Sequence, residues 1–201
     1  MKKIAIILLF FGIVLVSIGG VQLINTKKAQ NQSLQEAQAL LESSEKQYPS
    51  DAQSNQYDIT DFNPEIGEKV GILHIPKLSE DLPIVEGTDE DELAVGVGHY
   101  KDSAFPTEND QIVLSGHRDT VFRRMGELEL GDTLVVELPY GEFKYEIIQT
   151  EIVSADDKTV IRSTAPDEVL TLTTCYPFTF IGNAPDRYII TAIPTTQNSD
   201  E

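Results

Sequence analysis

The sequence contains a single cysteine, no tryptophan and few basic residues. Across 201 residues, 15 Lys and Arg stand against 33 Asp and Glu, which gives a net charge of −18. So acidic a chain repels phosphate backbones, and this excludes nucleic acid as a partner. Cys175 alone excludes an intramolecular disulfide, and one cysteine with three histidines is too small a set for a usual structural zinc site. Because 40% of the residues are hydrophobic, a globally disordered chain is excluded as well.

Positive charge is concentrated at the N-terminus. Residues 1–28 hold four lysines and no acid, so residues 29–201 carry 11 basic and 33 acidic groups, a net charge of −22. Between the lysines, the uncharged apolar run Ile4–Ile24 has 21 residues, and as a helix it would span about 30 Å, the thickness of a bilayer core. An uncleaved anchor is favoured. A cleaved signal peptide remains open, because Ser17 and Gly19 are spaced like a cleavage site.

The rest of the chain divides by composition. The expected units are a membrane anchor, a juxtamembrane helix or linker, a globular domain and a frayed acidic tail, at residues 1–28, 29–62, 63–194 and 195–201. Helix formers with Leu34, Ala37 and Leu41 along one stripe predict a solvated stalk helix or a loose spacer at residues 29–47. With the anchor in place, we expect a single-pass cell-membrane protein whose globular domain lies on the extracellular face.

The globular part shows the pattern of a β protein. Short β-branched runs predict strands at Val70–Ile75, Gln111–Leu114, Thr133–Leu138, Lys144–Val153, Val169–Thr174 and Tyr188–Ile193. Helical patches are short, at Glu90–Val95 and Thr120–Leu128. Because strands and helices do not alternate, a mostly β barrel or sandwich is favoured, large enough for its own core.

Cys175 is the first candidate for chemistry. It follows the alternating run Val169–Thr174 and precedes Tyr176-Pro177, and since proline cannot continue a central ladder, Cys175 is expected where the strand ends. A free cysteine is most often a small buried hydrophobic residue, and that interpretation remains open. Export favours a functional role, because an unpaired thiol outside the cell is exposed to oxidation.

Histidine and arginine supply possible partners. His117 follows a strand that ends in a small-residue turn, and Arg187 opens the last strand. His74 is expected on a strand surface, and His99 is expected either to be structural or to border a groove. A thiol, an imidazole and a guanidinium at strand ends would suit acyl transfer, with Cys as nucleophile, His as acid and base, and Arg as donor to the oxyanion.

Several segments together match the pattern of one known family. They are the TLxTC-like Thr171–Cys175, the histidine segment Leu114–Thr120, the arginine Arg187 twelve residues after Cys175, Gly96–Tyr100 and Leu73–Leu78. These segments resemble the sortases, cysteine transpeptidases that anchor proteins to Gram-positive cell walls. The similarity covers residues 66–193. It implies an eight-stranded β-barrel with short helices, and His117, Cys175 and Arg187 as the catalytic residues.

The resemblance also implies partners. These are exported proteins with a C-terminal LPxTG-like sorting signal, and an amine of a cell-wall precursor or of peptidoglycan. The signal is expected to lie between residues 151–167 and 176–186, and the substrate-binding residues expected there are Ala104, Val160, Ile161 and Thr174. No cofactor is implied. Calcium at Asp89–Glu92 is the less favoured alternative, since a run of acids is usually a solvated face.

Within the family, the HRDT and TLTTCYPF segments resemble class D, with class E close. Pilin-polymerising class C enzymes generally carry an Asp-Pro-aromatic lid and a second, C-terminal anchor. Residues 48–66 contain no Asp-Pro and the sequence ends in a polar stretch, so an open groove and protein anchoring are expected. Two alternatives remain: a hydrolytic cysteine peptidase that uses the same residues, and a non-enzymatic surface β-domain in which Cys175 is inert.

Overall fold

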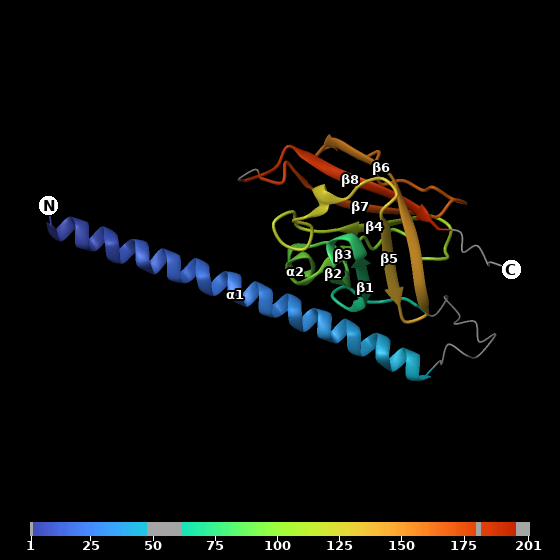
Figure 1. Ribbon diagram of the computed structural model, residues 1–201, viewed down its shortest axis with the longest axis horizontal. Helices are drawn as coiled ribbons and strands as arrows, with labels where there is room; N and C mark the ends of the chain where they lie inside the picture. The colour runs from blue at the N-terminus through green and yellow to red at the C-terminus, as the bar shows by residue number, and fades with distance from the viewer. Residues whose placement is uncertain (1, 48–61, 180–181, 196–201) are drawn as a thin grey trace.

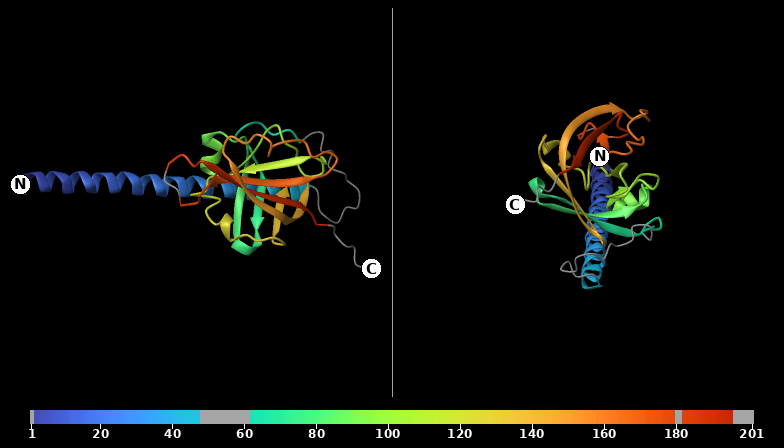
Figure 2. Two further views of the ribbon diagram at one scale, coloured as in Figure 1. Left: turned by 90° about the horizontal axis from the view of Figure 1, so that it is seen from above. Right: turned by 90° about the vertical axis from the view of Figure 1, so that its right-hand side faces the viewer.

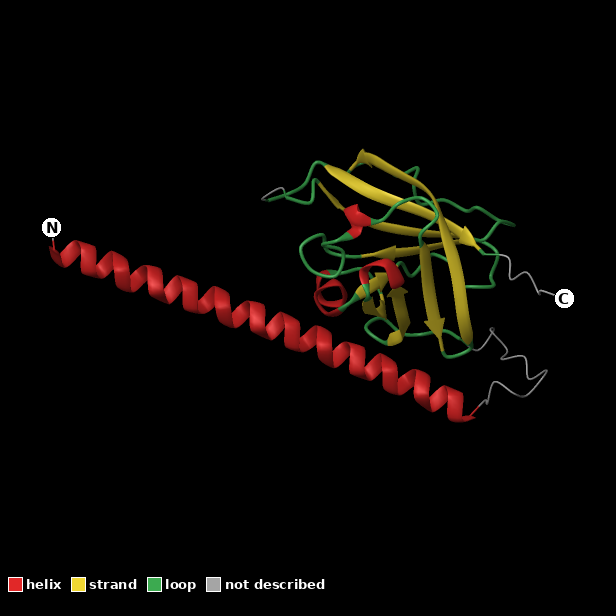
Figure 3. Ribbon diagram, in the orientation of Figure 1, coloured by secondary structure: helices red, strands yellow, loops and turns green. Residues whose placement is uncertain are grey.

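The computed structural model describes residues 2–47, 62–179 and 182–195, and it shows a long helix lying against a closed β-barrel (Figures 1 and 3). The strands are β1 (Lys69–Ile75), β2 (Glu80–Glu86), β3 (Val97–His99), β4 (Gln111–Ser115), β5 (Thr133–Leu138), β6 (Gly141–Ser154), β7 (Val169–Tyr176) and β8 (Asp186–Pro194). The helical elements are α1 (Lys2–Gln47), η2 (Pro76–Leu78), α2 (Glu90–Val95) and η3 (Met125–Glu127). The predicted eight-stranded barrel is confirmed.

The barrel closes in the order β1-β2-β3-β4-β7-β8-β6-β5. The β2–β3 and β4–β7 pairs are parallel, and the other pairs are antiparallel. Alternate residues of each strand fill the interior, for example Leu170 and Leu172 of β7 with Ile190 and Ala192 of β8. The other residues of β4, β7 and β8 therefore face the outside of the barrel, and this is the face that carries the candidate site.

All six predicted strands are present, but the sequence analysis did not predict β2 and β3. β2 contains Pro83 together with acidic residues, a composition that is unusual for a strand within a sheet. One of those acids, Glu86, is buried because its carboxylate is paired with the ring of His99, 2.7 Å away. β3 has only three residues, and a side chain at Gly98 would collide with the carbonyl oxygen of Gly87. Neither strand shows a run of alternating β-branched residues.

The helix α1 corrects one expectation about residues 29–47. This segment is neither a solvated stalk nor a loose spacer, because it continues the N-terminal helix and packs on the barrel (Figures 1 and 2). Ser33 and Ala37 are buried there, and Glu36 lies 3.4 Å from the ammonium group of Lys69. Small residues let the helix approach the barrel closely, which the apolar stripe alone did not specify. The N-terminal part of α1 exposes its apolar side chains and is long and apolar enough to cross a membrane.

The predicted linker after residue 47 and the predicted tail lie mostly outside the described residues. Of the predicted linker, Phe62 is described, and its ring packs edge-on against Phe105 and Tyr140 at centroid distances of 4.9 and 5.1 Å. Of the predicted tail, Thr195 is described, and its amide donates to the Lys144 carbonyl at 2.8 Å. These two residues therefore belong to the folded domain.

Candidate active site

Strand register brings the three predicted catalytic residues into one row. Ser115 of β4 pairs with Thr173 of β7, and two residues further along these parallel chains come His117 and Cys175. On the other side of β7, Cys175 pairs directly with Arg187 of β8. Residues paired across antiparallel strands have neighbouring side chains on the same face. The register therefore places His117, Cys175 and Arg187 across three adjacent chain segments at one end of the barrel.

Side-chain alternation directs this row to the outside of the barrel. Leu172 of β7 and Ile190 of β8 point into the core, so Cys175 and Arg187, at odd spacings from them, point outward. Cys175, His117 and Arg187 are each half-buried. A half-buried thiol remains accessible to a substrate and does not match a core cysteine.

The turn that carries His117 is fastened to β7 by two hydrogen bonds through Gly116. The Gly116 amide donates to the Thr173 carbonyl at 3.1 Å, and the Thr174 hydroxyl donates to the Gly116 carbonyl at 2.7 Å. Thr174 is 3% exposed, so its side chain contacts other groups of the protein and not solvent. A side chain at Gly116 would collide with the ring of Phe122, and therefore glycine permits the backbone here to lie this close to that ring.

The loop between β7 and β8 is held by arginines. The Arg187 guanidinium donates through Nη1 to the carbonyls of Ala184 and Asp186, at 3.3 and 3.0 Å. Arg118, next to His117 in the chain, donates to the carbonyls of Pro177 and Gly182, at 3.2 and 2.8 Å. These bonds connect the histidine turn to the cysteine side of the site and fix where the Arg187 guanidinium lies.

The loop between β6 and β7 is attached to the beginning of β4. The side-chain amide of Gln111 donates through Nε2 to the Val160 carbonyl and to the Thr171 hydroxyl, each at 2.9 Å. Its Oε1 accepts the backbone amide hydrogen of Arg162 at 2.8 Å. The Gln111 carbonyl accepts a hydrogen bond from the Ala104 amide at 2.8 Å. The structure thus gathers three of the predicted substrate-binding residues, Ala104, Val160 and its neighbour Ile161, around Gln111.

Asp110 provides a second attachment for the same loop. Its Oδ1 accepts the backbone amide hydrogens of Thr164, Gln111 and Ala165, and its Oδ2 accepts the hydrogen of the Ser163 hydroxyl at 2.9 Å. Hydrogen bonds from the Thr164 amide, the Gln111 amide and the Ser163 hydroxyl hold the pKa of Asp110 below its ordinary value, since they stabilise the carboxylate. Sequence reasoning missed Asp110, Gln111 and Arg118; only the adjacency of Arg118 to His117 marked any of them.

The other two histidines lie elsewhere. His74 sits between Asp81 and Glu137, with 2.7 Å from each ring nitrogen to a carboxylate. Burial opposes protonation of the ring, but these two hydrogen bonds outweigh it and raise the pKa of His74. His99 is buried, and its Nδ1 meets Glu86 while its Nε2 lies 3.0 Å from the Ala104 carbonyl. His74 is therefore a strand-surface residue as expected, and His99 is structural.

The structure was also searched for metal-binding clusters. Within residues 2–47, 62–179 and 182–195, no group of three or more His, Cys, Asp and Glu side chains is placed to hold a metal ion. The acids of the predicted calcium alternative lie at the start of α2, where Asp89, Glu90 and Asp91 are exposed.

Comparison with known proteins identifies the family of this chain. A model of the sortase domain matches residues 73–195. The chain belongs to the sortase family. It is 52% identical over 193 residues to Sortase D of Bacillus subtilis, which covers 94% of this chain and 96% of the relative. It is 31% identical over 134 residues to Sortase SrtE1 of Streptomyces coelicolor, covering 58% of this chain and 38% of that one.

A solved structure supports the fold of this sortase independently. The Sortase D5 transpeptidase of Clostridium perfringens superposes with a TM-score of 0.65 and 25% identity, covering 80% of this chain and 99% of that chain. The predicted resemblance to class D, with class E close, agrees with these relatives. This sortase is thus a cysteine transpeptidase, and the alternative of a non-enzymatic surface β-domain is excluded.

Proposed function

We propose that this sortase cleaves an LPxTG-like sorting signal through a thioester on Cys175 and transfers the acyl group to a cell-wall amine. The observation that carries the proposal is the row of His117, just after β4, Cys175 of β7 and Arg187 of β8. In the proposed reaction, Cys175 would be the nucleophile, with an acid–base group on one side and a cationic hydrogen-bond donor on the other.

Cys175 is the nucleophile of the proposed reaction. Its sulfur attacks the carbonyl carbon of the residue before the scissile bond, and the carbon–nitrogen bond then breaks to leave a thioester. His117 gives a proton to the departing amine. In the second step an incoming amine attacks the thioester carbon, His117 takes the proton from that amine, and the Cys175 sulfur leaves. Each turnover thus replaces one amide bond with another and restores the enzyme.

Arg187 stabilises the oxyanion that forms in both steps. A guanidinium stays charged at any working pH and presents several donors in a rigid plane. Its bonds to the carbonyls of Ala184 and Asp186 orient that plane beside Cys175. Losing one such oxyanion donor typically lowers the rate about 10²–10³-fold.

The substrate path is proposed along the outer faces of β4 and β7. Thr171 lies four residues before Cys175, which is about 13 Å along an extended strand. The side chain of Gln111 contacts Thr171, and Ala104, Val160 and Ile161 lie around Gln111. Because an extended peptide of four residues spans the same length, these residues would bind the leucine and proline of the signal. Thr174 is assigned instead to positioning, since its hydroxyl already binds Gly116.

The proposed setting is the outer surface of the cell membrane. Ile4–Ile24 would hold the protein in the bilayer as a single uncleaved span, with Lys2 and Lys3 inside and the barrel outside. Clients would be exported proteins that carry the signal near their C-terminus, and the acceptor would be an amine of a cell-wall precursor or of peptidoglycan. Anchoring rather than pilus assembly is favoured because residues 48–66 lack the Asp-Pro of a class C lid.

Mass spectrometry of the reaction with a Leu-Pro-x-Thr-Gly peptide tests this proposal. Without an amine, the peptide's acyl group is expected on Cys175; with an amine, the product is an amide. Cys175→Ala abolishes both products, Arg187→Ala loses about 10²–10³ in kcat, and Arg187→Lys recovers little of it. A hydrolysed peptide with no amide product at saturating amine would favour the hydrolytic peptidase. Full transfer by Cys175→Ala would refute the mechanism.

A further inference from the structure

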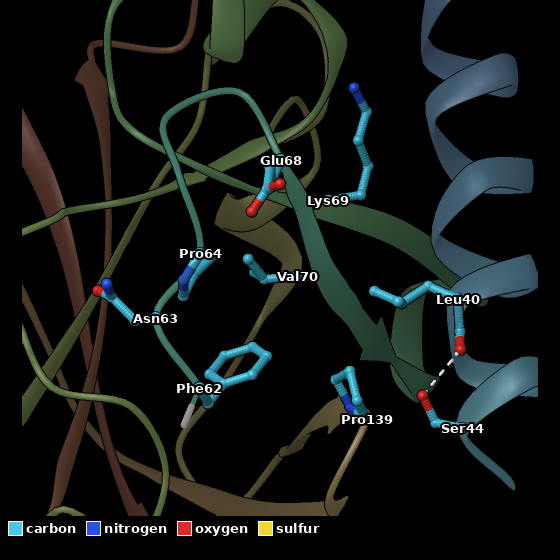
Figure 4. A pocket seen from close by; sticks show the side chains of 9 residues that line it. All are labelled: Leu40, Ser44, Phe62, Asn63, Pro64, Glu68, Lys69, Val70 and Pro139. Atoms are coloured by element: carbon cyan, nitrogen blue, oxygen red, sulfur yellow. Dashed lines mark hydrogen bonds between the residues drawn. The ribbon is translucent and has the colours of Figure 1, made fainter. Parts of the chain in front are cut away.

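Helix α1 crosses the barrel from one end to the other. The Gln30 amide donates to the Ala94 carbonyl at the end of α2, at 3.4 Å. Six residues later Glu36 meets Lys69, where β1 begins. Further on, Leu40 and Ser44 line a pocket with Val70 and Pro139 (Figure 4), and Figure 4 shows the Leu40 side chain directed toward the barrel.

Strand directions identify these two ends. β3 begins just after Ala94 and runs antiparallel to β4, with Gly98 beside Ser115, so Ala94 lies at the end of the barrel where β4 finishes and His117 follows. β1 is antiparallel to β2, which is parallel to β3; β1 therefore starts at the opposite end. Pro139, in the β5–β6 hairpin, lies at that opposite end as well.

The apolar part of α1 consequently leaves the barrel at the end that carries Cys175. Figures 1 and 2 show this arrangement, with the N-terminal half of α1 extending beyond the end of the barrel at which β8 begins. The helix is continuous through this region, from Lys2 to Gln47. Ile24 ends the apolar run and Gln30 makes the first barrel contact described above, so only six residues, about 9 Å of helix, separate them.

We infer that α1 holds the barrel with its catalytic end facing the lipid headgroups. The partner of this end is a bilayer surface, and the substrates it suits are peptides and amines that are themselves attached to the membrane. The inference rests on the proposed anchoring by Ile4–Ile24. Lys27 and Lys28 lie in the short interval beyond the apolar run, at the level where cationic side chains meet headgroup phosphates. Substrates held in the same bilayer would reach Cys175 at a raised local concentration.

Headgroup quenching of two fluorescent labels tests the orientation. Full-length protein with Cys175→Ala is placed in phosphatidylcholine–phosphatidylglycerol nanodiscs that carry a short-range nitroxide on the headgroup. One label is attached through Arg123→Cys, beyond the end of β4, and the matched label through Glu142→Cys, at the start of β6; both positions are exposed. The ends of the barrel are about 25 Å apart along β7. We expect several-fold stronger quenching at position 123, and equal quenching or stronger quenching at 142 overturns the inference.

A flexible insertion tests whether α1 sets this orientation. Eight Gly and Ser residues inserted after Lys28 keep the span and the barrel but break the helix between them. The difference between the two labels should then shrink, and an unchanged difference would overturn the role of α1. In the active background, the insertion should leave thioester formation with a soluble peptide unchanged and slow the reaction with a lipid-linked peptide. Absence of that thioester in the wild-type protein would instead count against the proposed function and leave the quenching result standing.

Discussion

The hydrogen bond from Thr174 to Gly116 offers a sharp test of how the histidine turn is positioned. Thr174→Val keeps the shape of the side chain but removes the hydroxyl, so the Gly116 carbonyl loses a 2.7 Å bond in a site where Thr174 is 3% exposed. Leaving such a group without its partner costs about 1–3 kcal/mol. In a domain of this size the melting temperature should fall by about 3–15 °C.

The same loss should appear in catalysis, because His117 directly follows Gly116. If the whole cost falls on the docked turn, kcat decreases by about 5- to 150-fold, since 1.36 kcal/mol corresponds to a factor of ten. KM should stay near the wild-type value. Thr174→Ser retains the hydroxyl and should retain most of the rate, and Thr191→Val on β8 serves as a control distant from the turn.

The assay is steady-state transpeptidation with the sorting-signal peptide, paired with thermal unfolding followed by circular dichroism. A Thr174→Val protein with wild-type kcat and a raised KM would show that this side chain contacts the substrate. That result would refute the positioning role and return Thr174 to the predicted substrate-binding residues.

Two further outcomes are expected from the structure. The pKa of Asp110 is lowered by hydrogen bonds from the Thr164 amide, the Gln111 amide and Ser163, so its contribution to stability is present above pH about 4 and is lost as the pH falls through the folded-state pKa. Hydrogen exchange of residues 160–165 should accordingly differ between wild type and Asp110→Asn at pH 7 and converge in acid; a constant difference would contradict this. Gly71→Ala should destabilise the barrel by about 1–3 kcal/mol, because its Cβ would collide with the Glu137 carbonyl oxygen; unchanged thermal unfolding would rule out that collision.

The sequence by itself determined the features that depend on local pattern. Short runs of β-branched and other apolar residues located β7 and β5, because such residues favour an extended strand whatever its neighbours are. Length and the absence of charge marked Ile4–Ile24 as a possible span, since a bilayer imposes a minimum length on any helix. The chemistry of a thiol, an imidazole and a guanidinium pointed to acyl transfer before their positions were known.

Only the tertiary structure decided how distant segments meet. β2 and β3 exist because their neighbours supply hydrogen bonds, and a pairing partner for Glu86, that their own composition does not predict. The adjacency of Cys175 and Arg187 follows from the register of β7 and β8, which barrel closure fixes. The attachment of residues 160–165 by Asp110 and Gln111 joins segments about 50 residues apart. The end of the barrel at which α1 leaves is also visible only in the structure. The small residues Ser33 and Ala37 indicate where a helix can approach the barrel, but not in which direction the helix runs.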